Sequence, residues 1–145
     1  MATFLNKDFD KMNKTLFFRI MAAFALFFGI ATIKEGGAVL FFNGEARLAA
    51  GHYVPFVLWF NFCAGFLYIL SGIGLWFIRT WGVTLAFFIF ISTGVIFLAF
   101  GIHVWSGGLY ENRTVVAMTI RTAVWAIMSF TGYYLDKHKK TPMGK

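Results

Sequence analysis

One arginine lies inside a long apolar run, and it is the residue of this chain best placed for chemistry. Arg121 belongs to the run from Val115 to Leu135. A charged side chain in the middle of a membrane-spanning helix costs about 2.5–3.5 kcal/mol, so we expect Arg121 to have a partner or a role. Binding an anion or another small ligand is one such role. A structural Arg–Glu pair, or a side chain that reaches to the interface, is the alternative.

Other polar side chains lie near the same end of the apolar runs. Asn61 lies six residues after Pro55, which is roughly 9 Å along a helix, and Arg121 lies eight residues after Arg113, roughly 12 Å. Asn61 also suits a plain hydrogen bond between helices. The stretch from His103 to Thr114 reads either as a well-capped tight turn or as one wall of a site. The candidate ligand-binding residues are Arg121, His103, Asn61, Glu35, Glu111 and Arg113.

A metal site is a second hypothesis for the same end of the chain. Its candidate ligands are His103, His52, Glu111 and Met118, because imidazole, carboxylate and thioether groups bind transition metals. The spacing is not diagnostic, since the sequence has no His-x-x-x-His pair, no Glu-x-x-His pair and no cysteine cluster. Histidines that only form hydrogen bonds at the interface are the alternative. A transition metal or a quinone is the cofactor to be considered.

Four long apolar runs must position these residues. We expect helical spans at about 16–36, 55–78, 81–105 and 114–135, each near the ~20 residues that cross a bilayer. Of the 145 residues, 59% are hydrophobic and 13% are charged, which is unlike a soluble domain. The runs are too long and continuous for barrel strands. The sequence therefore predicts an all-α, integral membrane four-helix bundle that forms one domain over residues 1–145.

The net charge of +7 indicates topology rather than nucleic-acid binding. Most of the 13 lysines and arginines lie at the two chain ends and in the short turn around Arg79, which all fall on one side of the membrane. The positive-inside rule then places both termini in the cytoplasm. We expect a multi-pass protein of a bacterial cytoplasmic membrane, with the lipid bilayer as its first partner and no nucleic acid.

Shorter features complete the predicted architecture. Residues 1–14 are polar, with apolar residues at 3–4 spacing, so we expect a short amphipathic helix on the membrane surface. Gly36-Gly37 predicts the end of the first span. We expect part of the following loop to form a short helix. Small residues in the second span predict a close helix contact, and these are Ala64, Gly65, Ser71, Gly72 and Gly74.

The last span has one stripe that we expect to face the bundle interior. Its residues recur at 3–4 spacing and are Thr114, Met118, Arg121, Trp125 and Met128. Side chains lean toward the start of their helix, so Arg121 should reach toward Glu35, His103 or Glu111 on the outer side. The inner half offers hydroxyls but no ionisable group. The sequence thus predicts an outer polar cup above an apolar floor.

Several of these positions resemble the DoxX-like family of small four-helix membrane proteins. The pattern covers the first span to the start of the third, and consists of Arg19, Gly29, Lys34, Asn61-x-x-x-Gly65, Gly72 and Arg79. The family commonly has a glutamate where Asn61 stands, which puts an acid–base or ion-pairing role there in doubt. The resemblance implies a membrane partner of a redox enzyme, sometimes linked to quinone or sulfur metabolism.

The favoured hypothesis is that the protein binds a small ligand in an outward-facing polar cup, in a redox context. The ligand would be a quinone head, an anion or a metal ion. The alternative is a non-catalytic accessory subunit of a membrane oxidoreductase or transport complex, which would make a membrane protein complex or a homo-oligomer the partner. It rests on the phenylalanine-rich surface and on the lack of a catalytic motif. The sequence does not decide whether the protein is an enzyme.

Overall fold

The computed structural model describes the backbone of residues 2–42 and 44–137, and the side chains of 12–42 and 44–137. The described residues form helices and short connections, without a strand. Four of the helices are long and apolar enough to cross a membrane, which confirms the predicted all-α architecture of four apolar spans. The helices are α1 (Ala2–Phe41), α2 (Glu45–Ala49), α3 (Pro55–Trp76), α4 (Thr80–Trp105) and α5 (Asn112–Lys137).

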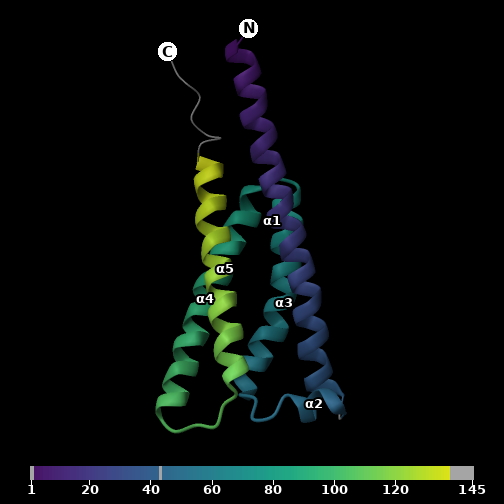
Figure 1. The fold of residues 1–145 in the computed structure, drawn as a ribbon, viewed down its shortest axis with the longest axis vertical. Coiled ribbons are helices and arrows are strands. Elements are labelled where there is room, and N and C mark those ends of the chain that lie inside the picture. Colours follow the sequence, from purple (N-terminus) through teal and green to yellow (C-terminus); the bar gives the residue numbers. More distant parts are fainter. Residues whose placement is uncertain (1, 43, 138–145) are drawn as a thin grey trace.

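The four long helices follow one another around the bundle, as Figure 1 shows. α1 packs most extensively on α3, α3 on α4, and α4 on α5, whereas α1 and α5 make the smallest contact of the touching pairs. The start of α1 and the end of α5 lie at one end, and α2 lies at the other (Figure 1). We name these the inner and outer ends, following the topology expected from charge.

α1 continues through Gly36-Gly37 to Phe41, so the predicted break there is wrong. Both glycines are buried, and a Cβ added to Gly36 would lie 3.3 Å from Cβ of Phe62 on α3. The glycines therefore provide room for a neighbouring aromatic side chain instead of a turn. At its other end α1 begins at Ala2 without a separate amphipathic helix, and the side chains expected on the membrane surface, such as Phe4, lie outside the described residues.

Small residues bring α3 against two different helices. A Cβ on Gly65 would lie 3.1 Å from the carbonyl oxygen of Gly29 on α1, and one on Gly72 would lie 3.1 Å from that of Ala22. Ser71 and Gly74 instead face α4, where the Ser71 hydroxyl donates a 3.0 Å hydrogen bond to the carbonyl of Gly82. The predicted close contact is thus confirmed, and it is divided between α1 and α4.

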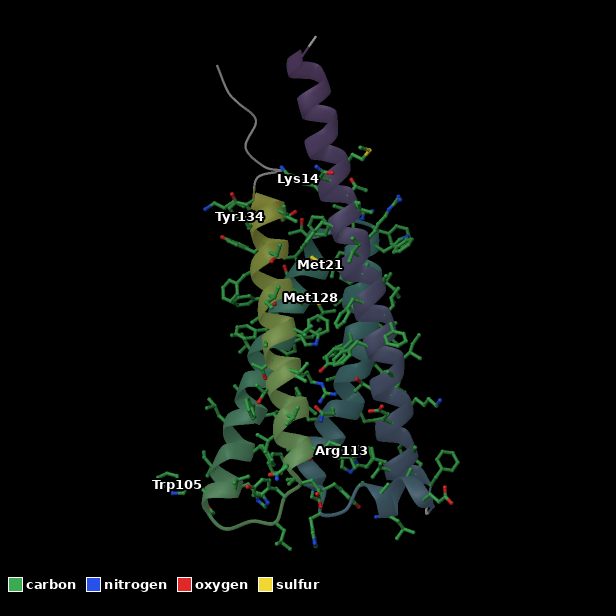
Figure 2. All side chains as sticks on the ribbon, viewed as in Figure 1. Lys14, Met21, Trp105, Arg113, Met128 and Tyr134 are labelled. Atoms are coloured by element: carbon green, nitrogen blue, oxygen red, sulfur yellow. The ribbon has the colours of Figure 1, made fainter. Side chains whose placement is uncertain are left out.

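The inner half of the bundle is closed by side chains from all four long helices. They form one buried cluster that includes Met21 of α1, Leu75 of α3, Ile89 of α4 and Met128 of α5. Figure 2 shows Met21 and Met128 at nearly the same level between α1 and α5. Gly132 of α5 lies against both neighbouring helices, because a Cβ there would lie 3.3 Å from a methyl carbon of Val83 on α4 and 3.7 Å from that of Met21 on α1.

The outer half has a separate and smaller cluster. Val54, Val57, Phe100 and Met118 are buried together, and they come from α3, its preceding residue, α4 and α5. No described residue of α1 belongs to this cluster. In the outer half, therefore, the described apolar cluster is built by α3, α4 and α5.

Candidate ligand-binding site

A cavity of about 520 Å³ lies where α1 and α5 are apart in the outer half. Its walls come from the second half of α1, from α2, from the first turns of α3 and from the first half of α5. This volume falls in the range of small-molecule sites. Four of the six predicted ligand-binding residues line it, namely Arg121, Asn61, Glu35 and Arg113.

Arg121 is the buried charged group of this cavity, with 8% of its surface exposed. Its Nη1 atom lies 3.8 Å from the Met118 sulfur, and its guanidinium lies over the Phe28 ring at 5.5 Å from the centroid. The buried Nε atom has no hydrogen-bond partner. Among the described residues no carboxylate forms an ion pair with Arg121, so the structure does not show the Arg–Glu pair that was one interpretation of the sequence.

Charged side chains around the cavity are mostly basic. Lys34, Arg113 and Arg121 line it together with a single carboxylate among its described lining residues, Glu35. Arg113 lies at the outer end of the bundle (Figure 2). It donates a 3.3 Å hydrogen bond to the carbonyl of Ala49. The cavity therefore has an excess of positive charge, which favours an anionic occupant over a cationic one.

Asn61 contributes an unpaired amide oxygen to the same cavity. The residue is half-buried on α3, and its Oδ1 atom is buried without a hydrogen-bond partner. Buried amide oxygens normally accept at least one hydrogen bond. In place of the hydrogen bond between helices that the sequence suggested, Asn61 thus presents an unused acceptor at a cavity wall.

His103 and Glu111 do not line the cavity, although both were predicted to bind ligand. The Nε2 atom of His103 lies 3.2 Å from the carbonyl oxygen of Leu109, and its ring contacts Gly108. Glu111 accepts a 2.9 Å hydrogen bond from the backbone N–H of His52. Both side chains therefore form hydrogen bonds with outer connections, and their predicted role in ligand binding stays a prediction.

The outer turn after α4 fits the interpretation as a capped turn. Gly107 has φ +81°, and the N–H of Gly108 bonds to the carbonyl of His103 at 3.0 Å. A left-handed glycine with this hydrogen bond is the Schellman motif that ends many helices. Gly107 and Gly108 thus end α4.

The structure gives the metal hypothesis no support. Within the described residues no three His, Cys, Asp or Glu side chains are grouped so that they could hold a metal ion. His52 and Glu111 meet through the backbone N–H of His52, which donates to the carboxylate. Met118 is fully buried in the small outer cluster, and its sulfur contacts Arg121.

Beneath Arg121 lies an aromatic group with buried polar atoms, which sequence reasoning missed. The Tyr68 ring stacks on Phe28 with centroids 5.7 Å apart and lies 4.6 Å from the ring of Trp125. The Tyr68 hydroxyl, the Thr93 hydroxyl and the Trp125 indole nitrogen are buried without hydrogen-bond partners. The expected apolar floor is therefore wrong in this respect. The spacing of four residues from Arg121 to Trp125 could have predicted that Trp125 lies beneath Arg121. Nothing in the sequence around Tyr68 or Thr93 indicated that they would join it.

The predicted interior stripe of the last span is confirmed. Met118, Arg121, Trp125 and Met128 are buried on α5, and Thr114 at its outer end is half-buried beside the cavity. Thr32 of α1 also lines the cavity and is buried, which the sequence did not indicate because a threonine inside an apolar run has no distinctive spacing.

Comparison of the chain with protein-family models, with curated proteins and with solved structures finds no match. The resemblance to the DoxX-like family accordingly stays a prediction.

Proposed function

We propose that this protein binds a small ligand with an anionic, hydrogen-bond-accepting head in the cavity between α1 and α5. The observation that carries the proposal is Arg121, a buried guanidinium that lines the cavity with no carboxylate partner among the described residues. A charge held in a membrane without a counterion is costly, and a ligand that supplies one removes that cost. Charge-assisted hydrogen bonds to a guanidinium are also about twice as strong as neutral ones.

The basic surroundings favour an anion over the other ligands considered. Lys34 and Arg113 add positive charge, and Glu35 offsets part of it. A quinone head would accept a hydrogen bond from Arg121 but would leave its charge without a counterion. A metal cation would be repelled by the three basic groups. The redox context rests on the family resemblance alone, and elemental analysis with a visible absorption spectrum of the purified protein would test for a metal or a chromophore.

The proposal is tested by comparing benzoate with benzamide, which is its neutral counterpart of similar shape. We expect benzoate to stabilise the protein in lipid nanodiscs increasingly with its concentration, by about 2.7 kcal/mol at a hundredfold excess over Kd, and so to raise the thermal unfolding temperature. Benzamide should give little response, and Arg121→Gln should abolish the benzoate effect. Arg79→Gln is the matched control, because Arg79 is an exposed arginine at the inner turn, away from the cavity.

Equal responses to benzoate and benzamide, or an unchanged benzoate response in Arg121→Gln, would contradict anion binding at this site. If a short-chain quinone stabilised the protein and benzoate did not, the result would support quinone binding in the cavity instead of anion binding.

We also propose that the inner end of the bundle faces the cytoplasm of a bacterial cell. Lys14, Arg19, Arg79 and Lys137 lie toward that end of the four spans, in agreement with the positive-inside rule. Reporter fusions at the inner α3–α4 turn and at the outer α4–α5 loop should be active on opposite sides of the membrane. Activity of the inner-turn fusion outside the cell would reverse the assignment.

A second candidate function is that of an accessory subunit that packs against another membrane protein or a second copy of this chain. The observation that favours it is α4, which is the most apolar of the four spans and the one least covered by the rest of the chain. Native mass spectrometry of polymer-extracted protein would show a stoichiometric complex that dissociates when Phe88, exposed on α4, is replaced by lysine. A monomer with bound lipid alone would contradict this candidate.

A further inference from the structure

The cavity is closed on three sides by named parts of the fold. The back of the cavity is formed by α3, through Leu58 and Asn61. Its outer end is formed by α2 and the following connection, through Ala46, Ala49 and Tyr53. Thr32, Glu35 and Val39 lie on one face of α1, and Thr114, Ala117 and Arg121 lie on one face of α5, so these two helices form its sides.

The remaining side opens between α1 and α5. Of the helix pairs that touch, this one has the smallest contact, and the buried cluster of the outer half contains no residue of α1. Two lining residues on opposite edges, Glu35 and Ala117, are exposed at the surface. Ala117 is five residues into α5, roughly 7.5 Å from its start, and therefore within the predicted span. The opening faces the side of the bundle, where lipid lies.

The outer end is held by hydrogen bonds between segments far apart in sequence. Arg113 at the start of α5 donates to the carbonyl of Ala49 at 3.3 Å, and Glu111 accepts the backbone N–H of His52 at 2.9 Å. These bonds fix α2 and the connection to α3 across the end that would face water. A ligand arriving from water would have to pass these hydrogen-bonded segments, whereas a ligand dissolved in the bilayer would approach the side between α1 and α5.

We propose that the ligand is a single-chain anionic amphiphile, with a carboxylate or phosphate head, that enters from the bilayer between α1 and α5. This inference rests on the proposed function. The head accepts hydrogen bonds from Arg121, and Lys34 and Arg113 add attraction at the cavity walls. The chain leaves through the side opening toward the lipid, where Val116, the sequence neighbour of the lining residue Ala117, is exposed. A head buried at Arg121 with its chain in lipid satisfies both the unpaired charge and the lateral opening.

The test uses one fluorophore at the opening and two spin-labelled probes in nanodiscs. The full chain carries Cys63→Ala and Val116→Cys, labelled with bimane, so that the label lies beside Ala117 without filling the cavity. The probes are 5-doxylstearic acid and its methyl ester, which share a chain and differ in head charge. We expect the acid to quench bimane with saturation and with an apparent affinity about tenfold higher than the ester, the ratio given by about 1.4 kcal/mol.

Two controls establish where the acid binds. Native Cys63 is exposed on α3, and bimane at this position should be quenched equally by the two probes, as at any lipid-facing site. Arg121→Gln in the Val116→Cys protein should reduce the effect of the acid to that of the ester, and Arg121→Lys should restore part of it. The comparison of acid with ester uses an unaltered cavity, so it stands even if a variant at Arg121 fails to fold.

The outcomes separate this inference from the proposed function. If acid and ester quench equally while benzoate still stabilises the protein through Arg121, the ligand is a water-soluble anion and the lipid inference fails alone. If benzoate also has no effect, both proposals fail. A preference for the acid that survives Arg121→Gln would place the binding elsewhere and overturn the inference. Displacement of the acid by stearate or octadecyl phosphate, with benzoate displacing it much less, supports an amphiphile.

Discussion

The inner and outer halves of the bundle use the same four long helices and close in different ways. In the inner half, α1 and α5 are joined through buried methionines, and α3 and α4 touch through backbone atoms at Gly74 and Gly82. In the outer half, the buried apolar cluster joins side chains of α3, α4 and α5, and the cavity containing Arg121 lies between α5 and α1. The inner half is arranged for close packing, and the outer half retains space beside the unpaired polar atoms of Arg121 and Asn61.

The difference follows from side-chain size and from polarity. Helices in lipid associate by close van der Waals packing, which glycines permit. In the outer half, the α5 stripe carries a guanidinium at Arg121, and Asn61 lines the same cavity. An apolar wall cannot close over such groups without leaving them buried and unpaired. We therefore expect substitutions in the two halves to have opposite signs.

The largest expected effect is at the inner backbone contact. A Cβ on Gly82 would lie 2.6 Å from the carbonyl carbon of Gly74 and 2.7 Å from the backbone nitrogen of Leu75, and neither atom can move away easily. We expect Gly82→Leu to lower the free energy of unfolding by about 3 kcal/mol, at the upper end of overpacking costs. Steric trapping in bicelles measures this quantity.

The matched control lies in the outer part of the same helix. A Cβ on Gly101 meets nothing within 4 Å, so Gly101→Leu should change the free energy of unfolding by less than about 1 kcal/mol. Equal losses in the two variants would show that the halves do not differ in packing as described.

A smaller effect with the opposite sign is expected at Arg121. Arg121→Leu should raise the free energy of unfolding of the ligand-free protein by about 1–2 kcal/mol. This is less than the roughly 2.5–3.5 kcal/mol cost of a mid-span arginine, because Arg121 lies nearer the outer end. The same variant should lose benzoate stabilisation. Destabilisation of the ligand-free protein would mean that Arg121 has a structural partner, and Arg79→Leu at the exposed inner turn serves as control.

Smaller changes in the free energy of unfolding are expected at two polar side chains of α3, one in each half of the bundle. Ser71 donates to the carbonyl of Gly82, so Ser71→Ala should cost about 0.6–1.7 kcal/mol, the range for hydrogen bonds between membrane helices. Asn61 has an unpaired buried oxygen, so Asn61→Ala should cost less than about 0.5 kcal/mol, because no hydrogen bond to that oxygen is lost. Unfolding of both variants under one set of conditions checks the order. A larger loss for Asn61→Ala would reveal a partner for its amide.

The smallest effects are expected for anion binding at the cavity edge. Glu35→Gln removes the carboxylate that lines the cavity and should tighten benzoate binding about two- to threefold, since an exposed charge pair contributes about 0.2–1 kcal/mol. His103→Ala should leave the benzoate affinity unchanged, because His103 lies against Leu109 and outside the cavity. Titration followed by thermal shift measures both. Weaker benzoate binding in His103→Ala would show that His103 contributes to the binding site.

Periodicity and spacing predicted much of what concerns one helix at a time. The four spans and the buried stripe from Met118 to Met128 follow from apolar length and 3–4 spacing, which are properties of a single segment. The glycines of α3 also indicated close packing correctly, though not which neighbour each would meet. The expected stop at Gly36-Gly37 was wrong, because a glycine pair permits a turn without requiring one, and here it makes room for Phe62.

The sequence by itself determined the number of long apolar helices, and from them it predicted a lipid solvent and an unusual cost for Arg121. Only the tertiary structure decided which polar groups meet. It brought Glu35, Asn61 and Arg113 to the cavity and turned His103 and Glu111 toward their own connections. It also placed Tyr68 beneath Arg121. The physical reason is that burial within one helix follows from local period, whereas a shared site depends on how far α1 and α5 stand apart, which the packing of all four helices sets.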